Sequence, residues 1–203
     1  MCNLSAVVAR ETDDYSHLDN KVRIATILGT FQSTLTDFKY LRKIWKDNTE
    51  EERLLGVSLT GILDSPLLNK KDMYLAEMLD SLKQVAIDTN KEYAEMLNIP
   101  QSAAITCVKP SGTVSQLVDS ASGIHARHSK YYIRTVRGAN KDPITEFLKS
   151  EGIPNEPDIT KRDTVTVFSF PMKSPSSAIF RTDMSAIEQL ELWLVYQRHW
   201  CEH

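Results

Sequence analysis

The sequence has little of what marks secreted, membrane-spanning or low-complexity proteins. It contains 3 cysteines without a CxxC pair, and only 7 glycines and 8 prolines in 203 residues. No stretch free of Asp, Glu, Lys and Arg exceeds 13 residues, which is too short to cross a membrane. No signal peptide is recognisable at the N-terminus, and the formal net charge of −3 argues against a surface built to coat nucleic acid. We therefore expect a cytoplasmic protein with free thiols and with no membrane or nucleic-acid partner.

The spacing of apolar residues predicts long helices that alternate with short strands. We expect a helix of roughly 25 residues from about His17, a second over residues 72–98, a short one over 142–150, and a last one capped by Asp183. Strands are predicted over the following ranges: 55–60, 103–108, 131–136 and 164–170. This pattern is typical of an α/β domain with a mainly parallel sheet. Without repeats or linkers, residues 1–203 are expected to form one domain, as part of a larger fold.

Two short sequence patterns resemble helix caps. The run Thr49-Glu50-Glu51-Glu52 resembles a capping box that opens a turn. Ser185 and Glu188 have the capping-box spacing and are expected in the first turn of the last helix.

One segment after the predicted strand at 103–108 has the composition of an anion site. A phosphate can be held by hydroxyl side chains together with backbone N–H groups that a glycine lets come close to the anion. Three hydroxyl residues and a glycine occur in this segment, and we predict a phosphate site made of these residues: Pro110, Ser111, Gly112, Thr113, Val114 and Ser115. The spacing is not that of a Walker motif. A plain turn between strand and helix is the alternative that the residues leave open.

The cysteines and histidines predict no further site by themselves. Cys2, taken alone, reads as an exposed thiol without a role. The pattern His199-x-Cys201-x-His203 puts the two histidines on one face of a helix but Cys201 nearly opposite, so we expect no metal site.

Five motifs in order along the chain nevertheless resemble one family. They are Cys2-Asn3-Leu4-Ser5, GVSLTG at 56–61, AITCVKPSGTVS at 104–115, SGIHARH at 122–128 and YQRHWCEH at 196–203. Together they resemble the catalytic subunit of adenosylcobalamin-dependent (class II) ribonucleotide reductases, particularly the monomeric ribonucleoside-triphosphate type. The resemblance runs over essentially the whole chain.

This resemblance implies a fold and a chemistry. The fold would be part, roughly the second half, of the family's ten-stranded α/β barrel. The activity would be reduction of ribonucleoside triphosphates to 2′-deoxyribonucleotides by thiyl-radical chemistry, with adenosylcobalamin as cofactor and thioredoxin as reductant. Cys2 matches one member of the redox cysteine pair, and residues 110–115 match the substrate-phosphate site. Cys107 and Cys201 match no catalytic cysteine and are expected to be structural.

The departures from the family are as informative. The family's radical cysteine, the glutamate two residues beyond it and the second redox cysteine have no counterpart here, nor does most of the cobalamin site. We therefore expect the chain to be inactive alone and to need an N-terminal reductase part, as in a split gene or a chain divided at an intein. The alternatives are a non-catalytic nucleotide- or phosphate-binding module and a structural remnant.

Overall fold

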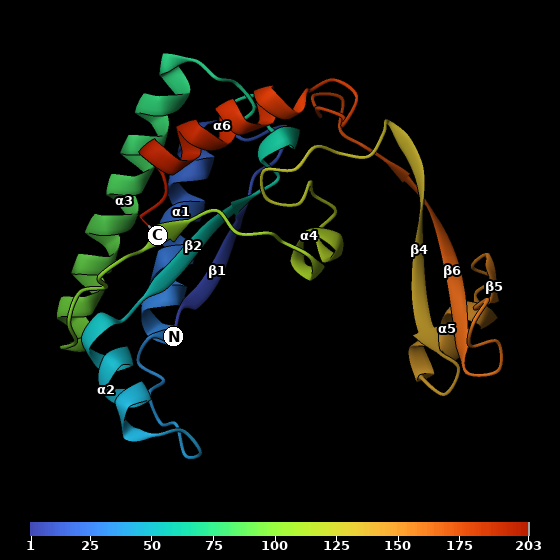
Figure 1. Cartoon of the computed structure of the whole chain (residues 1–203), viewed down its shortest axis with the longest axis horizontal. Helices are drawn as coiled ribbons and strands as arrows, with labels where there is room; N and C mark the ends of the chain where they lie inside the picture. The colour runs from blue at the N-terminus through green and yellow to red at the C-terminus, as the bar shows by residue number, and fades with distance from the viewer. Residues whose placement is uncertain (203) are drawn as a thin grey trace. The chain divides into compact units, whose positions relative to one another are not determined.

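A computed structural model describes residues 1–202, and the chain divides into two compact units (Figure 1). The larger unit combines Met1–Arg127 with the segment from Ser176 to the end of the described chain. The smaller unit is His128–Pro175. Among the described residues, no helix is both long and apolar enough to span a bilayer.

The larger unit contains a parallel three-stranded sheet. Its strands are β1 (Asn3–Val8), β2 (Leu55–Thr60) and β3 (Thr106–Cys107), in the order β1-β2-β3. Asn3 lies opposite Leu55, and Val57 lies opposite Thr106. The predicted strand at 55–60 is confirmed, the strand expected at 103–108 is reduced to two residues, and β1 was not predicted.

Helices cover one face of this sheet and form the core with it. The helix α1 (Tyr15–Gln32) and the helix α3 (Met73–Leu97) pack on each other, and the last helix, α6 (Ala186–His199), packs on α3. Most of the fully buried large side chains come from these helices, from β2 and from the turn η1 (Ile62–Asp64): Leu18, Val22, Leu55, Val57, Leu59, Ile62, Leu63, Leu75, Leu79, Leu82, Leu192 and Tyr196. Burial of this apolar surface is the main driving force for folding the unit.

The caps show where the helix predictions held. The Asp72 side chain accepts a hydrogen bond from the Leu75 N–H and starts α3, so the helix expected over 72–98 is confirmed. The capping box of Ser185 and Glu188 starts α6, so the predicted cap at Asp183 is wrong. Asp183 instead accepts a hydrogen bond from the N–H of Phe180 in the preceding turn.

The long helix expected from His17 is in fact two helices. It ends at Gln32, and α2 (Lys43–Glu52) follows after a loop. The helical spacing of apolar residues continues through that loop and into α2. Leu35 in the loop is 70% exposed and Trp45 in α2 is 48% exposed, so these apolar residues form no buried face. The four residues 49–52 end α2 rather than open a turn.

The smaller unit is antiparallel. Its strands are β4 (Tyr131–Ala139), β5 (Asn155–Pro157) and β6 (Val165–Lys173), in the order β4-β6-β5. The helix α5 (Pro143–Ser150) begins at the cap Asp142, so the short helix predicted at 142–150 is confirmed. The strands predicted at 131–136 and 164–170 are also found, but the expectation of a mainly parallel sheet holds only for the larger unit.

Candidate functional site

The face of the parallel sheet away from α1 carries two cysteines. Gly29 of α1 lies against Leu55, so Leu55, Val57 and Leu59 face the helices and the alternate residues of β2 face the other way. A β-carbon built on Gly56 would lie 2.9 Å from Sγ of Cys2 and 3.4 Å from Sγ of Cys107. The two sulfurs therefore share this face, no farther apart than the sum of those distances.

Both thiols are held in their protonated form by their surroundings. Burial raises the pKa of the Cys2 thiol, although the positive charges of the N-terminus and Lys109 oppose the change. Burial, followed by the nearby sulfurs of Cys2 and Cys201, raises the pKa of Cys107 to about 11. At neutral pH these groups are thiols, which are hydrogen-atom and electron donors rather than ready nucleophiles.

Cys2 and Cys107 do not form a natural disulfide pair despite their closeness. Cys2 precedes β1 and Cys107 lies in β3, with β2 between them. Two inter-strand spacings amount to about 9–10 Å, whereas a disulfide needs Cα atoms within about 7 Å. A bond between Cys2 and Cys107 would therefore require the backbone to move.

The loop predicted as a phosphate cradle directly follows β3 and leads into the short helix α4 (Thr113–Leu117). Its two buried serines bond within the loop. Ser111 Oγ accepts the N–H of Ser115, and Ser115 Oγ donates to the carbonyl of Ser111. These hydroxyls, which the sequence offers as donors to an anion, bond within the loop and shape it.

The outward groups of the loop are the backbone at 112–114 and one hydroxyl. Gly112, Thr113 and Val114 are exposed, and a β-carbon on Gly112 would meet nothing within 4 Å. Backbone N–H groups at 112–114 and Thr113 Oγ are thus the groups that a phosphate can reach. Backbone N–H groups at the start of a helical turn are good donors to an anion.

Side chains from the same face of β2 anchor this loop. Ser58 Oγ accepts the N–H of Lys109 at 3.1 Å. Thr60 Oγ accepts the N–H of Gly123 at 2.9 Å and donates to the carbonyl of Ala121 at 3.1 Å. Because Gly56, Ser58 and Thr60 alternate on one face, the Cys2 sulfur and the loop are brought to one side of the sheet.

Comparison with known proteins finds relatives that match this chain over part of their own length. No family model matches the chain. An adenosylcobalamin-dependent ribonucleoside-triphosphate reductase from Euglena gracilis is 32% identical over 165 residues, 78% of this chain and 22% of that protein. The enzyme of the same name from Lactobacillus acidophilus is 32% identical over 174 residues, 73% of this chain and 23% of that protein. The chain is homologous to a segment of these reductases.

A solved structure shares the fold over the whole chain. It is the crystal structure of a B12-dependent (class II) ribonucleotide reductase, with a TM-score of 0.80 and 23% identity. The match covers 100% of this chain and 32% of that one. The expected fold class, part of the larger reductase fold, is confirmed. The chain spans about a quarter of the length of its curated reductase relatives.

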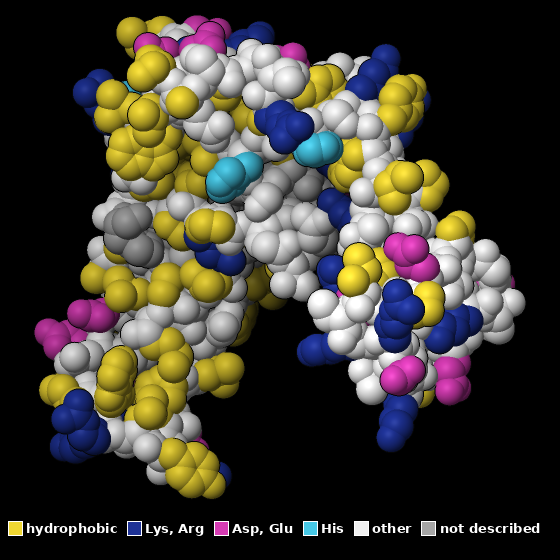
Figure 2. Space-filling view, turned by 45° about the vertical axis from the view of Figure 1, so that its right-hand side comes forward, with side chains coloured by type: hydrophobic (Ala, Val, Ile, Leu, Met, Phe, Trp, Pro, Cys, Tyr) yellow, Lys and Arg dark blue, Asp and Glu magenta, His cyan; other side chains and the backbone are white. Residues whose placement is uncertain are grey.

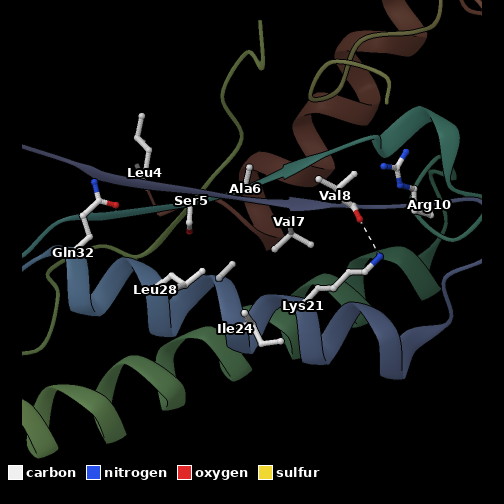
Figure 3. Close-up of a pocket in the computed structure, with 11 residues that line it drawn as sticks. Leu4, Ser5, Ala6, Val7, Val8, Arg10, Lys21, Ile24, Leu28 and Gln32 are labelled. Atoms are coloured by element: carbon white, nitrogen blue, oxygen red, sulfur yellow. Dashed lines mark hydrogen bonds between the residues drawn. The ribbon is translucent and has the colours of Figure 1, made fainter. Parts of the chain in front are cut away.

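The larger unit contains one groove beside β1 and another beside the loop. The first, about 640 Å³, runs between the open edge of β1 and α1 (Figure 3). It is lined mostly by aliphatic side chains, with Lys21 donating to the Val8 carbonyl at 3.0 Å and Arg10 nearby. The second, about 320 Å³, lies beside the loop, between Lys109, His125 and Trp193. The lining of neither groove identifies a place for adenosylcobalamin.

The candidate metal pattern at the C-terminus is described only at His199 and Cys201. His199 Nδ1 pairs with Asp80 at 2.9 Å, Cys201 is buried, and His203 lies outside the described residues. Among residues 1–202, no group of three metal-binding side chains comes together.

The strand predicted at 55–60 does not by itself single out Ser58 and Thr60, which hold Lys109, Ala121 and Gly123 beside the candidate loop. The alternation in LGVSLT, large apolar residues on one side and small or polar ones on the other, was the signal that could have found them.

Proposed function

We propose that this chain is part of the catalytic barrel of a ribonucleotide reductase. In this proposal residues 1–203 are roughly its second half, the backbone at 110–115 binds the phosphates of a ribonucleoside triphosphate, and Cys2 is one redox thiol. The observation that carries the proposal is the shared face of β2. Cys2 Sγ lies over Gly56, and Ser58, two residues further on, holds the start of the loop.

The redox step balances with two thiols. One thiol hydrogen leaves with the ribose 2′-hydroxyl as water, the other replaces the hydroxyl at C2′, and the two sulfurs form one S–S bond. Cys2 supplies one of these thiols, and the second belongs to a part of the reductase outside this chain because Cys107 is two strands away. The radical that starts the reaction also arises on that other part. Thioredoxin then reduces the disulfide by thiol exchange, in the cytoplasm, where free thiols persist.

Two exposed apolar surfaces support a partner segment. The outer edge of β1 pairs with no strand among the described residues, and the groove beside it exposes Ile24 and Leu28 of α1. A second surface surrounds α2 and appears in yellow at the lower left of Figure 2, with these exposed side chains: Leu35, Tyr40, Leu41, Ile44 and Trp45. Open strand edges and large apolar patches are usually covered. The missing reductase part is the occupant we propose.

Complementation tests this function. The chain is mixed with a separately expressed segment that carries the rest of a related reductase, and conversion of ribonucleoside triphosphate is measured with adenosylcobalamin and thioredoxin. We expect turnover only from the mixture. Cys2→Ser should abolish turnover and leave triphosphate binding unchanged, while Cys201→Ser should retain turnover.

Each other outcome assigns a different function. Triphosphate binding without turnover from any mixture favours the non-catalytic module. Aggregation of the chain without binding favours the structural remnant. Full turnover by the Cys2→Ser variant removes Cys2 from the reaction.

A further inference from the structure

A buried ion-pair network lies behind the candidate phosphate loop. The Arg127 side chain is 3% exposed. Its Nε and Nη2 donate to the two carboxylate oxygens of Asp64 at 3.0 and 2.9 Å. Its Nη1 donates to the carboxylate of Asp119 at 2.8 Å, and Nη2 also reaches the Asp119 carbonyl at 3.0 Å. Arg127 therefore clamps the end of η1 to the segment that follows α4.

The same segment is held from two more directions. Asp64 Oδ2 accepts the N–H of Ala121 at 2.7 Å. Arg10 donates to the carbonyls of Asp119 at 2.8 Å and Val118 at 2.5 Å. Asp119 itself has a left-handed backbone with φ of 46°. A non-glycine residue in that conformation needs surrounding contacts to keep it there.

These contacts reach the phosphate-facing backbone through Ser122. Ser122 Oγ donates to the Ser111 carbonyl at 2.7 Å and accepts the Ser111 N–H at 3.2 Å. The N–H of Ser120 donates to the Ser115 carbonyl at 2.9 Å. The loop at 111–115 is thus bonded to the segment at 120–122, and that segment is held by the Arg127 network.

The loop needs such support because α4 has only five residues. A helix this short is not stable by itself, and Gly112 to Val114 lie at the surface. Charge-assisted, bidentate bonds from an arginine are strong and directional. An anion site whose N–H groups are already oriented binds without the cost of ordering them.

We infer that Arg127 is a positioning residue for phosphate binding, acting through Asp119 and Ser122 on the backbone at 112–114. Its guanidinium is too deeply buried to touch the nucleotide. The inference rests on the proposed function, since it names what fixes the geometry of that same loop.

Titration of the full chain with inorganic tripolyphosphate tests the inference. The variant Arg127→Lys keeps the charge but not the bidentate bond, and we expect its Kd to rise about tenfold, the equivalent of one lost hydrogen bond to a charged group. The matched control is Arg137→Lys, which alters another Arg–Asp pair, to Asp158 in the smaller unit. Its Kd should equal that of the wild type.

Hydrogen exchange of the wild type and of Arg127→Lys, measured at one temperature well below unfolding, distinguishes loss of positioning from general destabilisation. In Arg127→Lys, amide protection should fall at residues 111–122 and stay unchanged in α3. In the complemented enzyme the KM for triphosphate should rise while kcat is largely kept. If Arg127→Lys does not fold, Asp119→Asn replaces it, since that side chain is 50% exposed and asparagine tolerates a left-handed backbone. A weakening of about threefold is then expected.

Two results overturn the inference and differ in what else they overturn. If the wild type binds tripolyphosphate and the variant tested, Arg127→Lys or Asp119→Asn, binds it equally well, Arg127 has no positioning role and the proposed function stands. If the wild type does not bind tripolyphosphate, the proposed phosphate site fails, and the positioning role fails with it.

Discussion

Replacing Gly56 by alanine should disturb Cys2 more than it disturbs the fold. The added β-carbon would lie 2.5 Å from Cδ2 of Leu4 and 2.9 Å from Sγ of Cys2, and atoms cannot remain that close. Leu4 is 48% exposed, so its methyl group can swing outward. The Cys2 side chain has to rotate or shift with it.

The expected cost follows from two opposing terms. Overpacking a buried position costs about 1–3 kcal/mol, and we expect about 1.5 kcal/mol because the nearest atoms belong to flexible side chains. Removing a glycine from the unfolded chain returns about 0.4–1 kcal/mol. The free energy of unfolding should therefore fall by roughly 0.5–1 kcal/mol in Gly56→Ala. Gly112→Ala has the same unfolded-state gain with nothing within 4 Å, and should be slightly more stable than the wild type.

Urea unfolding and the rate of alkylation by iodoacetamide, resolved by mass spectrometry for each cysteine, measure both effects. We expect Cys2 to be labelled several times faster in Gly56→Ala than in the wild type or in Gly112→Ala, with Cys201 unchanged. An unchanged labelling rate at Cys2, with the loss of stability present, would refute the placement of its sulfur over Gly56.

Three further predictions concern stability and pH. Because the pKa of Cys107 in the folded protein is raised to about 11, the stability that its neutral thiol supports should be lost as pH rises from 9 to 11. A free energy of unfolding that stays constant from pH 9 to 11 would contradict this expectation. Alkylation of Cys107 at pH 8 should be slow. Hydrogen bonds from Thr160 and Arg137 hold the pKa of the Asp158 carboxyl well below its ordinary 3.8. The smaller unit should therefore lose stability as pH falls below about 4, which hydrogen exchange of β6 would measure, and Asp158→Asn should remove that pH dependence. Trp200→Phe should cost about 2–3 kcal/mol in urea unfolding because fully buried Trp200 donates its Nε1–H to the Cys107 carbonyl at 2.8 Å; a loss under 1 kcal/mol speaks against that bond.

Much of the fold could be predicted because several elements carry their own local signals. The cap at Asp72 and the regular apolar stripe of α3 define that helix from sequence alone. The β-branched run of β6 defines a strand in the same way. Where the apolar spacing continued but burial did not, as in the loop before α2, the pattern misled. Periodicity shows which residues lie on one side of a helix, not whether anything covers that side.

The candidate site was only partly readable because it depends on contacts far apart in the chain. Residues 110–115 have a recognisable composition, yet Ser111 and Ser115 are turned inward by bonds to each other and by the bond from Ser122 Oγ to the Ser111 carbonyl. Arg127 meets Asp64 across 63 residues, and no local pattern indicates such a pair. The redox role expected of Cys2 rests on family resemblance, and the structure adds the position of its sulfur over Gly56.

We propose that this reductase homologue binds a ribonucleoside triphosphate through the backbone at 112–114. Adding ATP to the isotope-labelled chain and following its backbone amide signals by NMR tests this binding directly. We expect saturable shifts that are largest at Gly112, Thr113 and Val114, and equal shifts with tripolyphosphate. Shifts confined to the groove at His125 and Trp193, or none at all, would contradict it.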